Sequence, residues 1–80
     1  MVNGKQKVSA LTWLEEVKTR LQNQSKLKSL QPLAYRGTEE AWFDGYTISN
    51  RYVTIKVVGN EMWAKYEDRD DWLYVGHLRK

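Results

Sequence analysis

The stretch of residues 52–63 constrains the fold more than any other part of this sequence. Apolar and polar side chains alternate along it, as they do in a β-strand with one buried face. The apolar positions that share this face are Val53, Ile55 and Val57. Gly59 and Asn60 follow, and both residues suit the positive φ angles of a two-residue hairpin turn. The sequence therefore predicts a central β-hairpin.

The alternation continues on both sides of this hairpin. We expect four antiparallel strands, over residues 41–48, 51–58, 61–67 and 72–78, joined by turns at 49–50, 59–60 and 68–71. These turn lengths set the register, and they place the apolar residues of all four strands on one face. The expected neighbours are Val57 with Met62 and Trp42, Ala64 with Ile55 and Val75, Met62 with His77, Trp63 with Gly76, and Lys65 with Tyr74.

An amphipathic helix is predicted at residues 9–24. Ser9 is a suitable N-cap, because its hydroxyl can accept a hydrogen bond from the first turn. The stripe formed by Ala10, Leu14, Val17 and Leu21 is the only amphipathic cover for the apolar sheet face. We interpret residues 1–8 as a flexible arm and residues 25–40, which contain Pro32, as a connector whose spaced leucines tuck under the sheet edge.

These elements predict an α+β domain in which one N-terminal helix packs on a four-stranded antiparallel β-meander. The chain has 80 residues, which suits a single domain over 1–80. It contains no cysteine, and no apolar run approaches the roughly 20 residues that span a bilayer. The first ten residues lack the apolar stretch of a signal peptide. We therefore expect a cytoplasmic protein without membrane contact.

The predicted register leaves a second sheet face rich in aromatic rings and lysines. Lysines that lie across a sheet from tryptophan or tyrosine can form cation–π contacts. Flat aromatic surfaces with lysines between the rings are also typical of small β-domains that bind nucleic acid. The residues predicted to form this contact surface are Tyr52, Lys56, Trp63, Lys65, Trp72 and Tyr74, while Phe43 and Thr47 also point outward.

Charge is compatible with a nucleic-acid partner. Residues 1–37 contain seven Lys/Arg and two Glu, whereas residues 38–80 contain six Lys/Arg and eight Asp/Glu, so the N-terminal half is the basic one. Basic side chains at the margin could contact phosphates. These are Lys5, Lys7, Lys26, Lys28, Arg79 and Lys80. Glu67 on the same face and the acidic turn 68–71 weigh against a polyanion.

A protein partner is the alternative. Tyr, Trp and Met with mixed charge are typical of protein interfaces. A compact chain of this kind also suits a small inhibitor or adaptor, such as those encoded by phages and other mobile elements. A homodimer could bury the same face, and aromatic cross-strand pairs also stabilise sheets without any ligand.

No pattern indicates an enzyme, a metal site or a cofactor. The only histidine, His77, is expected on the inward face opposite Met62, and one His without Cys gives too few transition-metal ligands. The spacing of Asp68, Asp70 and Asp71 is not that of a calcium loop. Asp44 is an anomaly, since the predicted register turns it inward opposite Ile55. Either it lies at the rim, or the first strand contains a bulge and its register is wrong.

Overall fold

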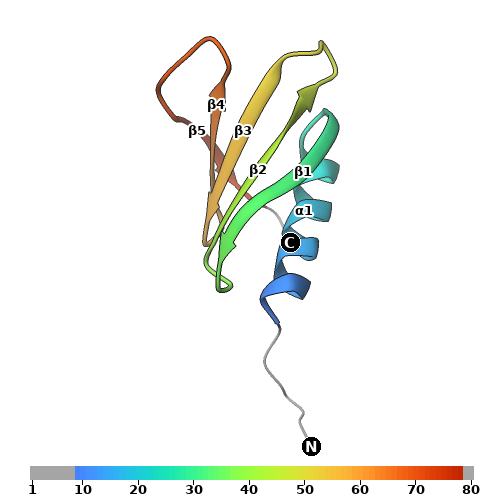
Figure 1. Ribbon diagram of the computed structural model, residues 1–80, viewed down its shortest axis with the longest axis vertical. Helices are drawn as coiled ribbons and strands as arrows, with labels where there is room; N and C mark the ends of the chain where they lie inside the picture. Colours follow the sequence, from blue (N-terminus) through green and yellow to red (C-terminus); the bar gives the residue numbers. More distant parts are fainter. Residues whose placement is uncertain (1–8, 79–80) are drawn as a thin grey trace, which may run out of the picture.

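The computed structural model describes residues 9–78 and contains one helix and one sheet. The helix α1 (Ala10–Gln24) precedes five strands: β1 (Leu27–Arg36), β2 (Glu40–Thr47), β3 (Tyr52–Val58), β4 (Glu61–Tyr66) and β5 (Leu73–His77). The strands form one antiparallel meander in the order β1-β2-β3-β4-β5 (Figure 1). The α+β architecture is as predicted, but the sheet has five strands instead of four. The arm predicted at residues 1–8 lies outside the described residues.

The helix forms where the sequence predicts it. Ser9 is its N-cap, and the Ser9 hydroxyl accepts a hydrogen bond from the Thr12 amide at 3.1 Å. The helix ends at Gln24. Its stripe of Leu14, Val17 and Leu21 is buried against the sheet.

The additional strand is β1, which occupies most of the segment that we expected to be a connector. Two register irregularities, between Leu27 and Ser29 and between Pro32 and Ala34, interrupt its pairing with β2. These irregularities break the alternation that would have identified a strand in the sequence. Pro32 is tolerated because β1 is an edge strand, where a missing N–H need not break the ladder.

The hairpin between β2 and β3 shows that the register predicted for the strand at residues 41–48 is wrong. Its loop has three residues, 48–50, because the Thr47 amide donates to the Arg51 carbonyl at 2.9 Å. Asn50 has a φ of 65°, as the last residue of such a loop requires. Tyr46 therefore pairs with Tyr52, and every residue of β2 faces the side opposite to the predicted one. Phe43 is buried and Trp42 and Asp44 face outward.

The two remaining hairpins differ in how well they follow the prediction. Between β3 and β4 the register is confirmed: Val57 pairs with Met62 and Ile55 with Ala64. Between β4 and β5 it is wrong, because an irregularity lets Met62 pair with Gly76 while Trp63 pairs with Tyr74. His77 consequently pairs with Glu61, and its side chain is 71% exposed instead of facing the core.

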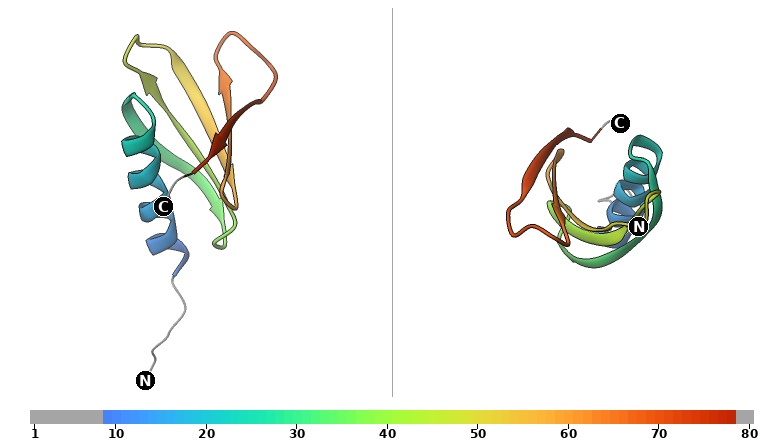
Figure 2. Two further views of the ribbon diagram at one scale, coloured as in Figure 1. Left: turned by 180° about the vertical axis from the view of Figure 1, so that it is seen from behind. Right: turned by 90° about the horizontal axis from the view of Figure 1, so that it is seen from above.

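The sheet is strongly curved, and α1 packs on its concave side (Figure 2). Alternate residues of β2, β3 and β4 line this concave face and form most of the core together with the helix stripe and Leu78. Gly45 allows β1 to approach β2, because a Cβ atom there would lie 2.1 Å from the Ser29 carbonyl oxygen. The opposite, convex face carries the other half of the side chains.

Candidate binding site on the convex sheet face

The convex face gathers most of the aromatic and lysine side chains that the sequence singles out. β3 and β4 contribute Lys56, Trp63 and Lys65 to it, because their neighbours along each strand point to the concave core. Tyr74 joins them from β5, and Trp72 joins them from the position directly before that strand. We call these five residues the aromatic–lysine cluster: Lys56, Trp63, Lys65, Trp72 and Tyr74.

Two ammonium groups lie over the indole rings of this cluster. The Lys56 Nζ atom is 5.5 Å from the centroid of the Trp63 ring and 4.9 Å from that of Trp72. The Lys65 Nζ atom is 5.2 Å from the Trp72 centroid. Among residues 9–78, no carboxylate forms an ion pair with either lysine. Their positive charges are therefore available to an anion from solution.

The third ring of the cluster is held by a carboxylate. Tyr74 packs edge-on against Trp63, with ring centroids 5.5 Å apart, and its hydroxyl donates to Glu61 Oε1. The other oxygen, Glu61 Oε2, is 2.7 Å from His77 Nε2. The hydrogen bond to Glu61 raises the pKa of Tyr74 above its ordinary value, because ionising the phenol would remove the donated proton. Glu61 thus fixes the ring at the edge of the cluster.

Tyr52, the sixth predicted residue, lies on the same face but contacts a different group. Its ring packs edge-on against Tyr46 at 5.6 Å, and its hydroxyl donates to Asp44 Oδ2 at 3.0 Å. Asp44 is therefore a half-buried acceptor on the convex face and not an inward anomaly, since the register of β2 differs from the predicted one. Tyr52 belongs to a second, smaller group with Tyr46 and Asp44.

Trp42, like Tyr46 and Asp44, lies on the convex face although the predicted register turned it inward. It lies on β2 directly opposite Lys56 and is half-buried. The predicted two-residue turn at 49–50 placed it in the core. The signal was present in the sequence: an inward Asp44 indicated a wrong register, and Asn50 suits the last position of a three-residue loop.

Charged residues around the cluster are partly paired with one another. Arg51 forms an ion pair with Asp68 at 3.0 Å and also lies over the Tyr66 ring. Arg69 lies 3.3 Å from Asp71, which raises the pKa of Arg69 and lowers that of Asp71. Two of the acidic residues in the turn 68–71 therefore have arginine partners.

The structure describes only two of the six basic side chains that were predicted at the margin of the contact surface. Lys26 is exposed after α1, and the Lys28 ammonium donates to the Asn50 side chain. Lys5, Lys7, Arg79 and Lys80 lie outside the described residues.

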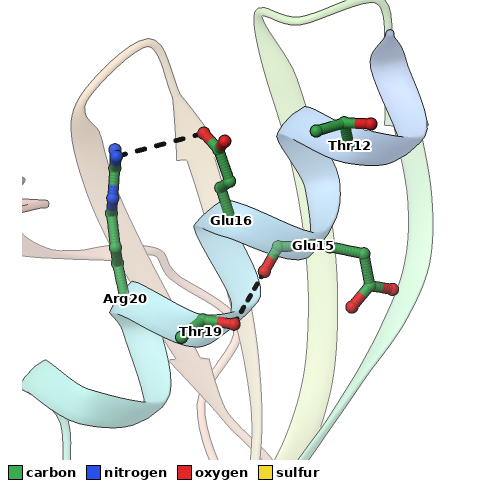
Figure 3. A pocket seen from close by; sticks show the side chains of 5 residues that line it. All are labelled: Thr12, Glu15, Glu16, Thr19 and Arg20. Atoms are coloured by element: carbon green, nitrogen blue, oxygen red, sulfur yellow. Dashed lines mark hydrogen bonds and ion pairs between the residues drawn. The ribbon is translucent and has the colours of Figure 1, made fainter. Parts of the chain in front are cut away.

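A shallow pocket of about 300 Å³ lies on the solvent side of α1, lined by Thr12, Glu15, Glu16, Thr19 and Arg20 (Figure 3). Its side chains are engaged along the helix: Arg20 lies 3.9 Å from Glu16, and the Thr19 hydroxyl donates to the Glu15 carbonyl at 3.0 Å. Such pairs, one helical turn apart, are ordinary features of an exposed helix.

Within residues 9–78, no group of three or more acidic or histidine side chains is placed to hold a metal ion. The described chain also has no helix with both the length and the apolar character needed to cross a bilayer. Comparison with models of protein families, with curated proteins and with solved structures finds no match for this chain.

Proposed function

We propose that this protein is a small non-enzymatic binding module that binds nucleic acid through the aromatic–lysine cluster. One observation carries the proposal: Lys56 and Lys65 hold their ammonium groups over indole rings on the convex sheet face, and neither forms an ion pair with a carboxylate of residues 9–78. A nucleotide offers both groups that such a surface recognises, a π-face for the rings and a phosphate for the lysines. The proposal also places the protein in the cytoplasm, a compartment with which a chain without cysteine is compatible.

The magnitudes favour a nucleobase over the lysines as the partner of these rings. An exposed cation–π contact contributes about 0.5–1 kcal/mol, whereas stacking of one base on an aromatic ring contributes about 1–3 kcal/mol. A base can therefore displace an ammonium group from an indole, and the displaced group can move to a phosphate of the same strand. The cluster would then exchange internal interactions for interactions with the ligand.

The test is equilibrium binding to a fluorescently labelled oligonucleotide, followed by anisotropy and by quenching of tryptophan emission. We expect binding at about 50 mM salt that weakens as salt is raised. The double variant Lys56→Ala/Lys65→Ala should weaken binding by about tenfold or more. It should also reduce the slope of log K against log salt by about 0.7 for each phosphate that the protein no longer neutralises.

The matched control is Lys18→Ala/Arg20→Ala, which removes the same number of positive charges from α1. Both residues lie on the helix at the concave side of the sheet, so we expect nearly unchanged affinity. The proposal is wrong if the wild-type protein causes neither an anisotropy change nor quenching at about 50 mM salt, or if both double variants weaken binding equally.

A protein partner is the second candidate, and one feature favours it. Glu61 is part of the same surface, where it binds Tyr74 and His77, so the surface has mixed charge. Aromatic rings within mixed charge are typical of protein interfaces, and an inhibitor or adaptor would use them in this way. Self-association through this face would give a homodimer, which sedimentation would detect. In either case Trp63→Ala or Trp72→Ala would abolish the protein complex, and oligonucleotides would not compete with it.

A further inference from the structure

The curvature of the sheet bears on which kind of nucleic acid the convex face can accept. The aromatic–lysine cluster lies on the outside of the curve, because α1 and the core occupy the concave side (Figure 2). Its members come from three adjacent strands in a sheet of five. The surface is therefore broad and bulges outward where the rings are.

A surface of this shape does not fit a duplex groove. The cluster spans three strands of a continuous sheet, whereas the major groove of B-form DNA is about 12 Å wide and admits a helix or a two-stranded ribbon. A convex face also touches the outside of a cylinder only along a narrow line. The two-residue turn that could enter a groove consists of Gly59 and Asn60, and it carries neither a ring nor a positive charge.

The rings themselves require unpaired bases. Tyr74 is 55% exposed and Trp63 and Trp72 are half-buried, so each residue presents part of its surface to solvent. A base within a duplex has both faces covered by its neighbours and cannot stack on a protein ring unless it leaves the helix. Bases of a single strand can turn outward onto the rings, while the backbone passes the two ammonium groups.

We propose that the aromatic–lysine cluster selects single-stranded over double-stranded nucleic acid, with an unpaired base stacked on Trp72 between Lys56 and Lys65. Trp72 is assigned this role because both ammonium groups lie over its ring, at 4.9 Å and 5.2 Å from its centroid. This inference rests on the proposed function and specifies its ligand. It adds strand selectivity and a central stacking residue, neither of which nucleic-acid binding by itself requires.

The experiment compares one labelled strand of about 12 nucleotides with the same strand annealed to its complement, at one salt concentration. The wild-type protein should bind the single strand at least about tenfold more tightly than the duplex, and only the single strand should quench tryptophan emission. Trp72→Ala should weaken single-strand binding about 5- to 150-fold, the reduction expected for one stacked base, while Trp72→Phe should retain most of the affinity. Far-UV circular dichroism verifies that each variant is folded.

Tyr35→Ala is the matched control, since Tyr35 is 42% exposed and lies on β1 opposite Ala41, on the concave side of the sheet. It should leave single-strand affinity unchanged.

Equal or tighter duplex binding overturns the inference and leaves nucleic-acid binding standing, whereas binding to neither ligand overturns both. Single-strand binding that survives in folded Trp72→Ala overturns the role of Trp72. If that variant does not fold, equal quenching of the wild-type emission by strand and duplex overturns the inference instead.

Discussion

At the scale of single residues, Lys56 connects most of the convex face. Its ammonium lies over two indole rings, those of Trp63 and Trp72, and its backbone pairs with Trp42 on the other side. A long side chain between two rings can serve as internal packing when no ligand is bound, because its methylene groups cover apolar surface while its charge stays near water. One residue thereby links three of the four tryptophans in the chain.

Tyr74 provides a prediction about alkaline pH. Its pKa is raised above 10.0 by the hydrogen bond to Glu61, so the folded state favours the neutral phenol. The stabilisation from this hydrogen bond is complete below the unfolded pKa of about 10 and disappears as the pH rises through the higher folded value. Glu61→Gln should therefore lower the pKa of Tyr74.

Titration of tyrosinate absorbance measures this shift, with the contribution of Tyr74 obtained by subtracting the curve of Tyr74→Phe. Glu67→Gln is the control, because it removes an exposed carboxylate directly after β4 that forms no hydrogen bond with Tyr74 in the structure. A Tyr74 midpoint that Glu61→Gln leaves unchanged would show that the hydrogen bond does not exist in solution.

At the scale of elements, the loop between β2 and β3 decides which residues enter the core. The three-residue loop buries Phe43, which has no measurable exposure, and turns Trp42 outward. A two-residue loop would do the reverse. Which of these two residues is buried therefore indicates the register of β2.

Parallel substitutions distinguish the two registers. We expect Phe43→Leu to lower the free energy of unfolding by about 1–2 kcal/mol, because it leaves unfilled space in a fully packed site. Trp42→Leu should cost about half of that or less, since the indole is only half-buried. Urea denaturation of both variants provides the comparison. A larger decrease for Trp42→Leu than for Phe43→Leu would contradict the observed register.

At the scale of the whole molecule, the last part of the chain returns to the helix. Gln24 at the end of α1 donates to the His77 carbonyl at 2.7 Å, and the Leu78 amide donates to the Asn60 carbonyl at 2.7 Å. Leu78 is 5% exposed and belongs to the core, whereas Leu73 at the start of β5 is 38% exposed. The segment after β5 thus helps to close the concave side.

This arrangement predicts unequal effects of two leucine truncations in the same region. Leu78→Ala should lower the free energy of unfolding by about 2–4 kcal/mol, the usual cost of emptying a buried leucine site. Leu73→Ala should cost about 1 kcal/mol, because much of its side chain already contacts water. Equilibrium unfolding in urea measures both. Equal decreases would show that the C-terminal segment does not close the core.

The sequence by itself determined the elements whose signals are local. The Ser9 cap and the stripe of Leu14, Val17 and Leu21 define α1, since capping and helical spacing act within a few residues. Gly59 and Asn60 define a two-residue turn, and that turn sets the register of β3 and β4. The cross-strand pairing of Lys56 with Trp63 follows from this hairpin alone, and the candidate site is built around that pair.

Only the tertiary structure decided the remaining features, because each depends on pairing between segments. β1 is a strand because β2 pairs with it, although its own pattern is broken at two irregularities. The β2 register follows from a loop whose two possible lengths have similar local chemistry, and the shift in β5 depends on the unusual φ of 136° at Gly76. The curvature that makes the aromatic face convex arises when the sheet wraps around α1, and no local pattern encodes it.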